Sequence, residues 1–235
     1  MILDVPRSPR VVSLYRYPVK SMTGESVTRL ELDQRGCVGD RQWSVRTEAD
    51  KIGSGKNSRR FAAIPGLLDV RASERDGLVA VTFLDGSSCL VDDPEAAARL
   101  SQYVGRPVRF ARETSVTHFD DGPVSLIGRA SVDAVTEEQH EAVDPARFRA
   151  NIHLATASPF LEDSWLGRQL QIGPAVFKVE MTSPRCVMVN MATADLPEQP
   201  GNLTAIGRIN NTCLGVIATV IAPGTISLGD EVTIR

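Results

Sequence analysis

The sequence predicts a mainly β fold with a few helices, of the α+β class. Short segments that alternate apolar and polar residues, separated by turns, dominate residues 1–90 with almost no helical periodicity. One run of strong helix formers follows at residues 94–104, and strand-like segments return through the C-terminal half. The first 90 residues are therefore expected to form a β-barrel or a sandwich-like unit.

The composition is that of a soluble globular chain with one or two domains, because 42% of its 235 residues are hydrophobic and 23% are charged. A net charge of −3 disfavours bulk nucleic-acid binding but leaves room for a local cationic pocket. No apolar run approaches the roughly 20 residues that span a bilayer, and residues 1–10 contain Asp4 and two prolines in place of a signal-peptide core. We expect a cytoplasmic protein that binds neither nucleic acid nor membranes.

The first strand is predicted at residues 11–17, where a proline follows and removes a hydrogen-bond donor. The next loop carries Lys20 and Ser21 side by side, and Gly24 is expected to close it with a positive φ. This loop either connects two strands and nothing more, or it offers a cation and a hydroxyl group to a ligand.

Two further strands are predicted at residues 27–32 and 40–45. The second begins with Asp40 and Arg41, whose opposite charges allow an ion pair. Such a pair is sufficient to explain both residues, so the pattern alone gives Arg41 no other role.

A glycine-flanked lysine at position 56 resembles part of a phosphate-binding P-loop, but two positions exclude that motif. The glycine required five residues before Gly55 is Asp50, and Asn57 replaces the Ser or Thr that should follow Lys56. Backbone N–H groups and an ammonium group can still contact an anion. Lys56 is therefore a candidate anion contact, with a solvated surface residue as the alternative.

The helix predicted at residues 94–104 has proline and glutamate near its start and Gly105 at its stop position. A second helix is expected to run from a cap at Ser131 towards His140. Asp120 and Asp121 lie in a loop, where adjacent carboxylates are usually solvated. Other strands are predicted at residues 78–84, 88–91, 108–111, 124–127, 152–155, 175–181 and 214–221, and residues 223–234 are expected to form closing strands around tight turns.

Arg149 and Asn151 occupy alternate positions of a segment that is expected to be extended. Alternate residues of an extended chain point to the same side, so a guanidinium group and an amide would lie together. Taken alone, this pattern does not distinguish a binding site from an ordinary strand entry.

Cys186 is the leading candidate for chemistry, because Arg185 precedes it and a guanidinium group favours the thiolate, the reactive and metal-binding form. The alternative is a small buried apolar side chain. The four cysteines are scattered and show no Cys-x-x-Cys spacing, and the three histidines form no cluster. A zinc or iron–sulfur site is therefore not expected.

Five motifs in order resemble the MOSC family, in the form that carries an N-terminal β-barrel domain. The match runs nearly end to end and is similar to the branch that contains the mitochondrial amidoxime-reducing component and its bacterial relatives. The motifs are Tyr17-Pro18-Val19-Lys20-Ser21, Gly39-Asp40-Arg41-Gln42-Trp43, Phe148-Arg149-Ala150-Asn151-Ile152, Arg185-Cys186 and Pro223-Gly224-x-Ile226-x-Leu228-Gly229-Asp230.

The resemblance implies an N-terminal β-barrel domain at residues 1–105, a MOSC domain at residues 106–235 and a molybdenum cofactor (molybdopterin with Mo) between them. Cys186 falls at the position that supplies a protein sulfur to molybdenum. Positions that hold the cofactor are occupied by Lys20, Ser21, Arg41, Lys56, Arg149, Asn151, Ser183 and Arg185. Cationic side chains suit an anionic pterin dithiolene that ends in phosphate, and molybdenum favours thiolate ligands.

By the same resemblance, the protein is a molybdenum-dependent oxidoreductase that reduces N-oxygenated small molecules with electrons from a separate electron-donor protein. The competing class is a sulfur carrier that uses a Cys186 persulfide, or a cofactor-binding module without turnover. Many relatives have cysteine at position 183, where this chain has serine, so Cys186 has no dithiol partner there. The resemblance also carries an association with pyridoxal phosphate, to which we assign no residue.

Overall fold

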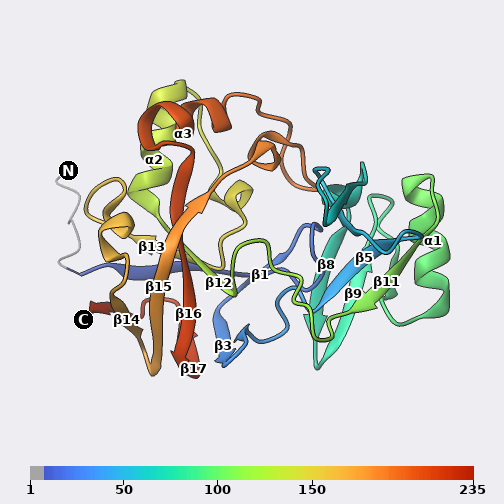
Figure 1. The fold of residues 1–235 in the computed structure, drawn as a ribbon, viewed down its shortest axis with the longest axis horizontal. Helices are drawn as coiled ribbons and strands as arrows, with labels where there is room; N and C mark the ends of the chain where they lie inside the picture. The colour runs from blue at the N-terminus through green and yellow to red at the C-terminus, as the bar shows by residue number, and fades with distance from the viewer. Residues whose placement is uncertain (1–7) are drawn as a thin grey trace.

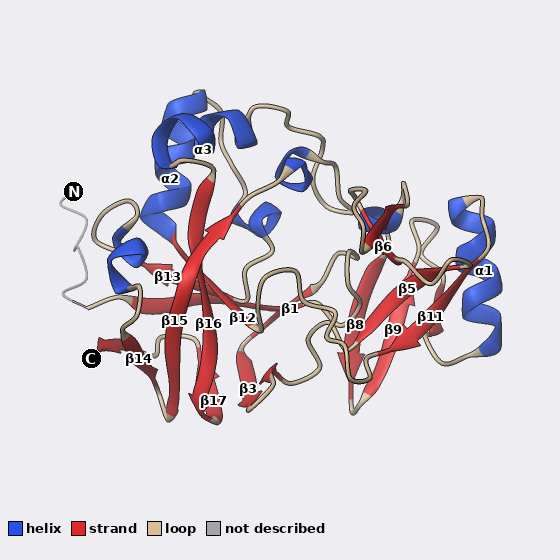
Figure 2. Cartoon of the chain, viewed as in Figure 1, coloured by secondary structure: helices blue, strands red, loops and turns tan. Residues whose placement is uncertain are grey.

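The computed structural model describes residues 8–235. The N-terminal segment on which the expectation about Asp4 rests lies mostly outside the described residues. Two bodies lie side by side in Figure 1, the larger containing β15 and β16 and the smaller containing β9 and α1. Strands dominate both bodies and the longer helices lie at their outer sides (Figure 2), which confirms the predicted α+β class.

An eight-stranded sheet forms the larger body. Its order is β18 (Val232–Ile234), β14 (Gln169–Ile172), β15 (Ala175–Pro184), β16 (Cys213–Ala222), β12 (Val124–Gly128), β13 (Ile152–Ala155), β1 (Arg10–Arg16) and β2 (Glu25–Val27). Only β12 and β13 run parallel to each other. A second sheet contains β17 (Gly224–Ser227), β3 (Arg29–Asp33) and β4 (Gly36–Cys37). Leu14, Leu126 and Phe177 are fully buried in the core of this body, which the hydrophobic effect stabilises.

The smaller body contains two short sheets and one helix. One sheet has the order β11 (Val108–Arg112), β5 (Trp43–Thr47), β6 (Ile52–Ser54) and β7 (Phe61–Ala63), and the other has β10 (Ser88–Leu90), β9 (Leu78–Thr82) and β8 (Arg71–Arg75). Val45, Ile64, Val81 and Leu100 are buried in a separate hydrophobic core. The two bodies therefore have independent cores, and the loops between them are available for a binding site.

The first helix matches the prediction residue for residue. α1 (Pro94–Val104) begins after Asp93, whose carboxylate accepts a hydrogen bond from the Glu95 N–H, and it ends at Gly105 with φ 69°. α2 (Arg129–Gln139) begins two residues earlier than the predicted cap at Ser131, so that prediction is wrong.

The N-terminus of α2 is satisfied by a carboxylate from another segment. Glu162 accepts hydrogen bonds from the Gly128 N–H (2.9 Å) and the Ser131 hydroxyl (2.8 Å). Ser131 therefore supports the capping group from inside the first turn. Because residue 162 is remote in sequence, no local pattern could have revealed it.

The helix α3 (Asn202–Asn210) was not predicted. It contains glycine, threonine and two asparagines, all weak helix formers, and its N-terminus is capped from another segment, where the Asn190 side-chain oxygen accepts from the Leu203 N–H (2.9 Å). Ala205 and Ile206 are buried in the third hydrophobic cluster, to which α2 also contributes. Tertiary packing thus overrides local propensity here.

In the loop at residues 18–24, the residue with a positive φ differs from the predicted one. Ser21, and not Gly24, has the positive φ (64°). A Cβ on Gly24 would lie 2.3 Å from the Arg16 carbonyl oxygen and 2.5 Å from the Tyr17 ring. Glycine is needed there for close approach, so the predicted positive φ is wrong.

The division into residues 1–105 and 106–235 stays a prediction, and the sheets cross it. β1 pairs with β13, and β3 pairs with β17, so four N-terminal strands belong to the larger body. The chain then enters the smaller body before β5 and leaves it after β11. The two crossing segments, between β4 and β5 and between β11 and β12, border a cavity between the bodies.

Candidate functional site

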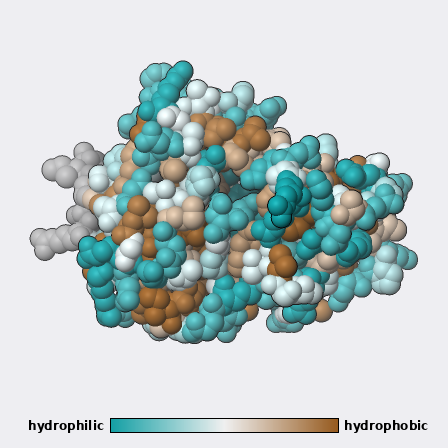
Figure 3. Space-filling model, viewed as in Figure 1, coloured by the Kyte–Doolittle hydropathy of each residue, from teal (hydrophilic) through white to brown (hydrophobic). Residues whose placement is uncertain are grey.

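A cavity lies where the two bodies meet. Its wall combines a loop of the smaller body, the crossing segments and the end of β15. The lining residues are Arg41, Lys56, Asp120, Asp121, Gly122, Ser125, Arg147, Phe148, Arg149, Ser183, Pro184, Arg185, Cys186, Met188, Val189 and Ile217. Five of these side chains are cationic and two are carboxylates, so the wall is locally basic within an acidic protein. The face shown in Figure 3 is largely hydrophilic, with small apolar clusters between polar residues.

Cys186 is placed by the long antiparallel pair β15 and β16. Pro184 at the end of β15 lies opposite Cys213, and the Arg185 N–H donates to the Thr212 carbonyl (2.8 Å). Cys186 then leads into the 3₁₀ turn η4 (Val187–Asn190), where its carbonyl accepts from the Val189 N–H (3.2 Å). The half-buried thiol is therefore held at the end of a rigid strand and lines the cavity.

Arg185 fixes the backbone beside this thiol. Its Nε donates to the Leu214 carbonyl (2.8 Å), and one terminal nitrogen donates to the Phe148 carbonyl (2.8 Å). Gly215 (φ 79°) leaves the room that this requires, because a Cβ there would lie 3.3 Å from the Arg185 guanidinium. Burial lowers the pKa of Arg185 to about 10, while Cys186 acts in the opposite direction. Arg185 thus holds in place the backbone from which Cys186 enters the cavity.

Arg149 differs from the other arginines of this wall in the surroundings of its guanidinium group. It follows the 3₁₀ turn η2 (Pro145–Phe148) with φ 53°, so this position is not extended as expected. Its guanidinium lies 4.4 Å from the Tyr17 ring, and within residues 8–235 it donates no hydrogen bond and forms no ion pair. Burial lowers its pKa to about 10, and nearby Arg41 adds to that effect. A bound anion would relieve this unfavourable placement.

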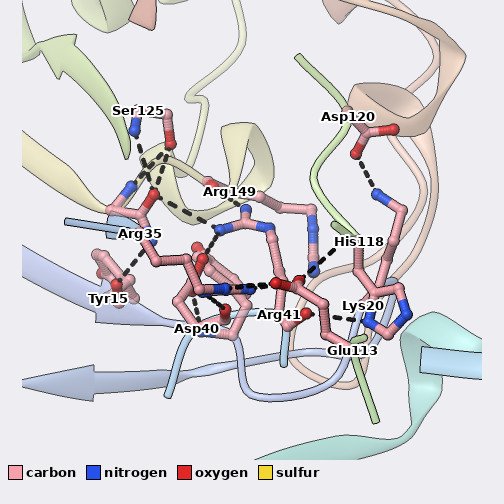
Figure 4. A network of polar contacts seen from close by, with 12 residues as sticks. Tyr15, Lys20, Arg35, Asp40, Arg41, Glu113, His118, Asp120, Ser125 and Arg149 are labelled. Atoms are coloured by element: carbon pink, nitrogen blue, oxygen red, sulfur yellow. Dashed lines mark hydrogen bonds and ion pairs between the residues drawn. The ribbon is translucent and has the colours of Figure 1, made fainter. Parts of the chain in front are cut away.

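Arg41 is held by several acceptors at the centre of the polar network in Figure 4. It pairs with Asp40, donates to the Arg149 carbonyl (3.0 Å) and approaches the Asn151 amide oxygen (3.5 Å). The same amide oxygen accepts from the Ser125 hydroxyl (2.9 Å). Arg41 and Asn151 therefore hold the segments around Arg149 in place, and the pair of Arg41 with Asp40 that the sequence suggested is present.

Lys20 and Lys56 share one carboxylate. Lys20 Nζ lies 2.5 Å from Asp120 Oδ2, and Lys56 Nζ lies 3.9 Å from Asp120 Oδ1. Both ammonium groups also face the Phe61 ring, at 5.0 and 5.6 Å from its centroid. Asp120 thus pairs with two lysines at the cavity, where the sequence alone favoured a solvated carboxylate.

The structure brings most of the predicted site residues to one place. Arg41, Lys56, Arg149, Ser183 and Arg185 line the cavity together with Cys186. Lys20 and Asn151 are buried and bonded to lining residues, whereas Ser21 is buried in the loop after Lys20. These placements agree with the predicted set, although their roles stay predictions.

Sequence reasoning missed one residue that lines the cavity, Arg147, and one that lies behind the wall, Tyr17. Tyr17 is buried with its ring between Arg41 and Arg149, and burial raises its pKa to about 12. Arg147 lines the cavity and donates to the Met191 and Pro197 carbonyls (3.2 and 2.5 Å). Tyr17 stands in a quoted motif, and Arg147 lies two residues before Arg149, but neither spacing indicated a side-chain role.

Residues 113–233 match the family model described as the MOSC domain, which is more than half of the chain. The chain belongs to the MOSC family. Residues 8–107 match the model described as the MOSC N-terminal beta barrel domain. These matches confirm the resemblance drawn from the five motifs.

Curated relatives of this MOSC protein include two kinds of enzyme. A molybdenum cofactor sulfurase of Drosophila grimshawi is 27% identical over 243 residues, covering 86% of this chain and 31% of that protein. The mitochondrial amidoxime reducing component 2 of Bos taurus is 26% identical over 223 residues, covering 77% and 66%. The chain spans less than a third of the length of the sulfurases that it matches.

Among solved structures, the YUAD protein from Bacillus subtilis has the same fold. The TM-score is 0.55 at 15% identity, with 97% of this chain and 95% of that chain covered. At this identity the likeness extends to the fold alone. None of the helices within residues 8–235 is long and apolar enough to span a membrane.

The residues that line the cavity fit a molybdenum cofactor, the group for which the related sulfurases are named. A half-buried thiol offers the soft ligand that molybdenum favours, and the unpaired Arg149 offers a charge to an anionic pterin. Among the described residues no cluster of three or more His, Cys, Asp or Glu side chains could hold a metal ion.

The buried Lys20 predicts a pH effect on the stability of this MOSC protein. Burial lowers the pKa of Lys20 to about 8, although Asp120 opposes this, whereas the same group titrates at 10.5 when unfolded. Between these values the unfolded chain binds more protons, so the free energy of unfolding should rise with pH. From pH 8 to 9.5, the free energy of unfolding measured with urea should rise by about 1 kcal/mol more per pH unit in the wild type than in the variant Lys20→Met. Equal slopes for the two proteins would contradict the assignment.

Proposed function

We propose that this MOSC protein is a molybdenum-cofactor-binding oxidoreductase that reduces N-oxygenated small molecules. The observation that carries the proposal is the single thiol of Cys186 in one cavity with the unpaired Arg149. The similarity to the amidoxime reducing component of Bos taurus supports the reaction class. Reduction of an N–OH group to N–H with release of water consumes two electrons and two protons, and we propose that a separate electron-donor protein supplies the electrons.

The chain's own residues have three tasks in this proposal. Cys186 anchors the metal, while Arg149 and Lys56 neutralise the anionic part of the cofactor. Arg41, Asn151 and Arg185 keep these groups in position through the hydrogen bonds described above. When bound, the cofactor would supply a two-electron redox centre for the substrate.

A second candidate is a sulfur carrier in which Cys186 holds sulfur as a persulfide. Two observations favour it: several relatives are named molybdenum cofactor sulfurase, and the thiol lines an open cavity without a second cysteine among its lining residues. Ser183 occupies the position where a dithiol partner would stand. A persulfide at Cys186 would therefore not be resolved by that neighbour.

One preparation separates the two functions. The protein is purified under conditions that preserve cofactors, and bound molybdenum, pterin and sulfane sulfur are measured beside the reduction of a simple oxime by reduced methyl viologen. The oxidoreductase proposal expects near-stoichiometric molybdenum and pterin with turnover. Sulfane sulfur on Cys186 without molybdenum or pterin would support the carrier, and stoichiometric cofactor without turnover would support a binding module.

A further inference from the structure

Two adjacent carboxylates line the cavity, and their surroundings differ. Asp120 is paired with Lys20, which it faces in Figure 4, and with Lys56. The side chain of Asp121 forms no ion pair and accepts no hydrogen bond within residues 8–235. We propose that Asp121 gives the proton that an N–OH substrate needs when its N–O bond breaks. The inference rests on the proposed function and adds a catalytic residue to it.

The other groups of the cavity lining are poor proton donors. Four of its five cations are arginines, whose guanidinium groups keep their protons, and the fifth, Lys56, is paired with Asp120. Burial acts to raise the pKa of Asp120, but Lys20 and Lys56 lower it overall, so this carboxyl group is held ionised. Among the described residues of the lining, none is a histidine, glutamate or tyrosine. With Cys186 as the metal ligand, Asp121 is the acid group that is left.

The backbone around Asp121 is fixed on both sides. Before it, His118 Nδ1 donates to the Arg41 carbonyl oxygen at 3.1 Å. After it, a Cβ on Gly122 would lie 2.3 Å from Ile217 Cγ2, so the chain lies directly on β16 there. β12 begins two residues later and pairs with the same strand. The carboxyl group therefore stands on a rigid segment of the cavity wall, as a proton donor requires.

Asp121 and Cys186 lie near the same guanidinium group. Burial lowers the pKa of Arg185, and the charges of Cys186 and Asp121 are the two largest that oppose this effect. Both residues also line the one cavity, so a small substrate there shares an enclosed space with both. Asp121 is exposed to solvent as well, so its carboxylate can take up a new proton after each turnover.

The step balances in atoms and electrons. The N–O bond breaks and its electron pair leaves with the oxygen, which takes the proton of the Asp121 carboxyl group and departs as water. The nitrogen gains two electrons, which the electron donor supplies, and one proton from solvent, so that N–OH becomes N–H. Asp121 is then a carboxylate and is protonated again from solvent. A positioned acid of this kind typically accelerates a reaction by about 10²–10⁴-fold.

The test measures reduction of acetaldoxime by reduced methyl viologen with the cofactor-loaded protein. Asp121→Asn keeps the size of the side chain but removes the acid, so kcat should fall by about 100-fold or more while KM changes little. Asp121→Ala should show the same loss. Added formate, a small carboxylic acid in its protonated form, should raise the kcat of Asp121→Ala several-fold but leave Asp121→Asn unchanged, because asparagine still fills the space.

A second readout does not depend on turnover. The protein is labelled with ¹³C at the aspartate carboxyl groups, and the Asp121 signal is assigned by its loss in Asp121→Asn. Titration with acetaldoxime in the absence of an electron donor should shift this signal. The signal of Asp133, which lies on α2 and does not line the cavity, should stay unchanged.

Glu198→Gln is the matched control, because Glu198 is an exposed carboxylate that does not line the cavity. It makes the same change in net charge and should keep the kcat of the wild type. Equal kcat in the wild type and Asp121→Asn would overturn the proton-donor assignment alone, as would an equal loss in Glu198→Gln. A wild type that binds cofactor but does not reduce acetaldoxime would overturn the proposed function, and this inference with it.

Discussion

Replacing Cys186 with alanine is expected to lower the affinity of the protein for molybdenum by roughly 100-fold or more, so that the purified variant retains less metal than the wild type. Loss of a group that merely supports a metal ligand costs 10–100-fold in affinity, so loss of the protein's own ligand should cost at least the upper end. Cys186 is the one cysteine that lines the cavity, at the end of a strand held by Arg185. Metal analysis per mole of folded protein, with pterin fluorescence after release, measures the effect.

Cys213 provides the matched control for this experiment. It lies opposite Pro184 in the pairing of β15 with β16, and the Thr182 hydroxyl approaches its sulfur at 3.5 Å. It does not line the cavity, so Cys213→Ala should keep the molybdenum content of the wild type. Unchanged molybdenum in Cys186→Ala, or an equal loss in both variants, would refute the ligand assignment.

Local patterns were sufficient for most single elements of this fold. Alternation located β1, β9 and β16, and α1 was found because its proline, glutamate and final glycine mark both ends. α3 was not predicted, because its stability comes from packing against α2 and not from the helix propensity of its residues. The sequence also did not predict that β1 and β3 belong to the larger body, because strand pairing across more than 100 residues leaves no local pattern.

The motifs predicted which residues meet, and the structure adds what each one contacts. Lys20 and Asp120 are 100 residues apart, so their ion pair depends on how the crossing segments are placed. No sequence pattern distinguishes Arg41, whose donors are occupied by backbone and side-chain oxygens, from Arg149, whose donors have no partner within residues 8–235. That difference decides which arginine can serve a ligand, and it arises only from tertiary structure.

Replacing Arg149 with methionine is expected to weaken anion binding and to stabilise the cofactor-free protein. Inorganic phosphate serves as the probe, and its affinity should fall roughly tenfold, because a charge-assisted hydrogen bond contributes about 1.5–3 kcal/mol. Removing a half-buried cation that has no ion-pair partner among the described residues should raise the free energy of unfolding by about 1–2 kcal/mol. Titration calorimetry and urea unfolding of protein from cells that lack the cofactor measure the two effects.

Arg147→Met is the matched control, because Arg147 lines the same cavity but its guanidinium is already bonded to two backbone carbonyls. Its removal deletes both hydrogen bonds, so the free energy of unfolding should fall by about 1–3 kcal/mol. The two substitutions, two residues apart, therefore have opposite expected signs. A loss of stability in Arg149→Met with unchanged phosphate affinity would mean that Arg149 serves the fold and not a ligand. A gain in stability together with weaker phosphate binding would identify it as a cation placed for the site at the expense of the fold, as strained or unpaired groups at functional sites often are.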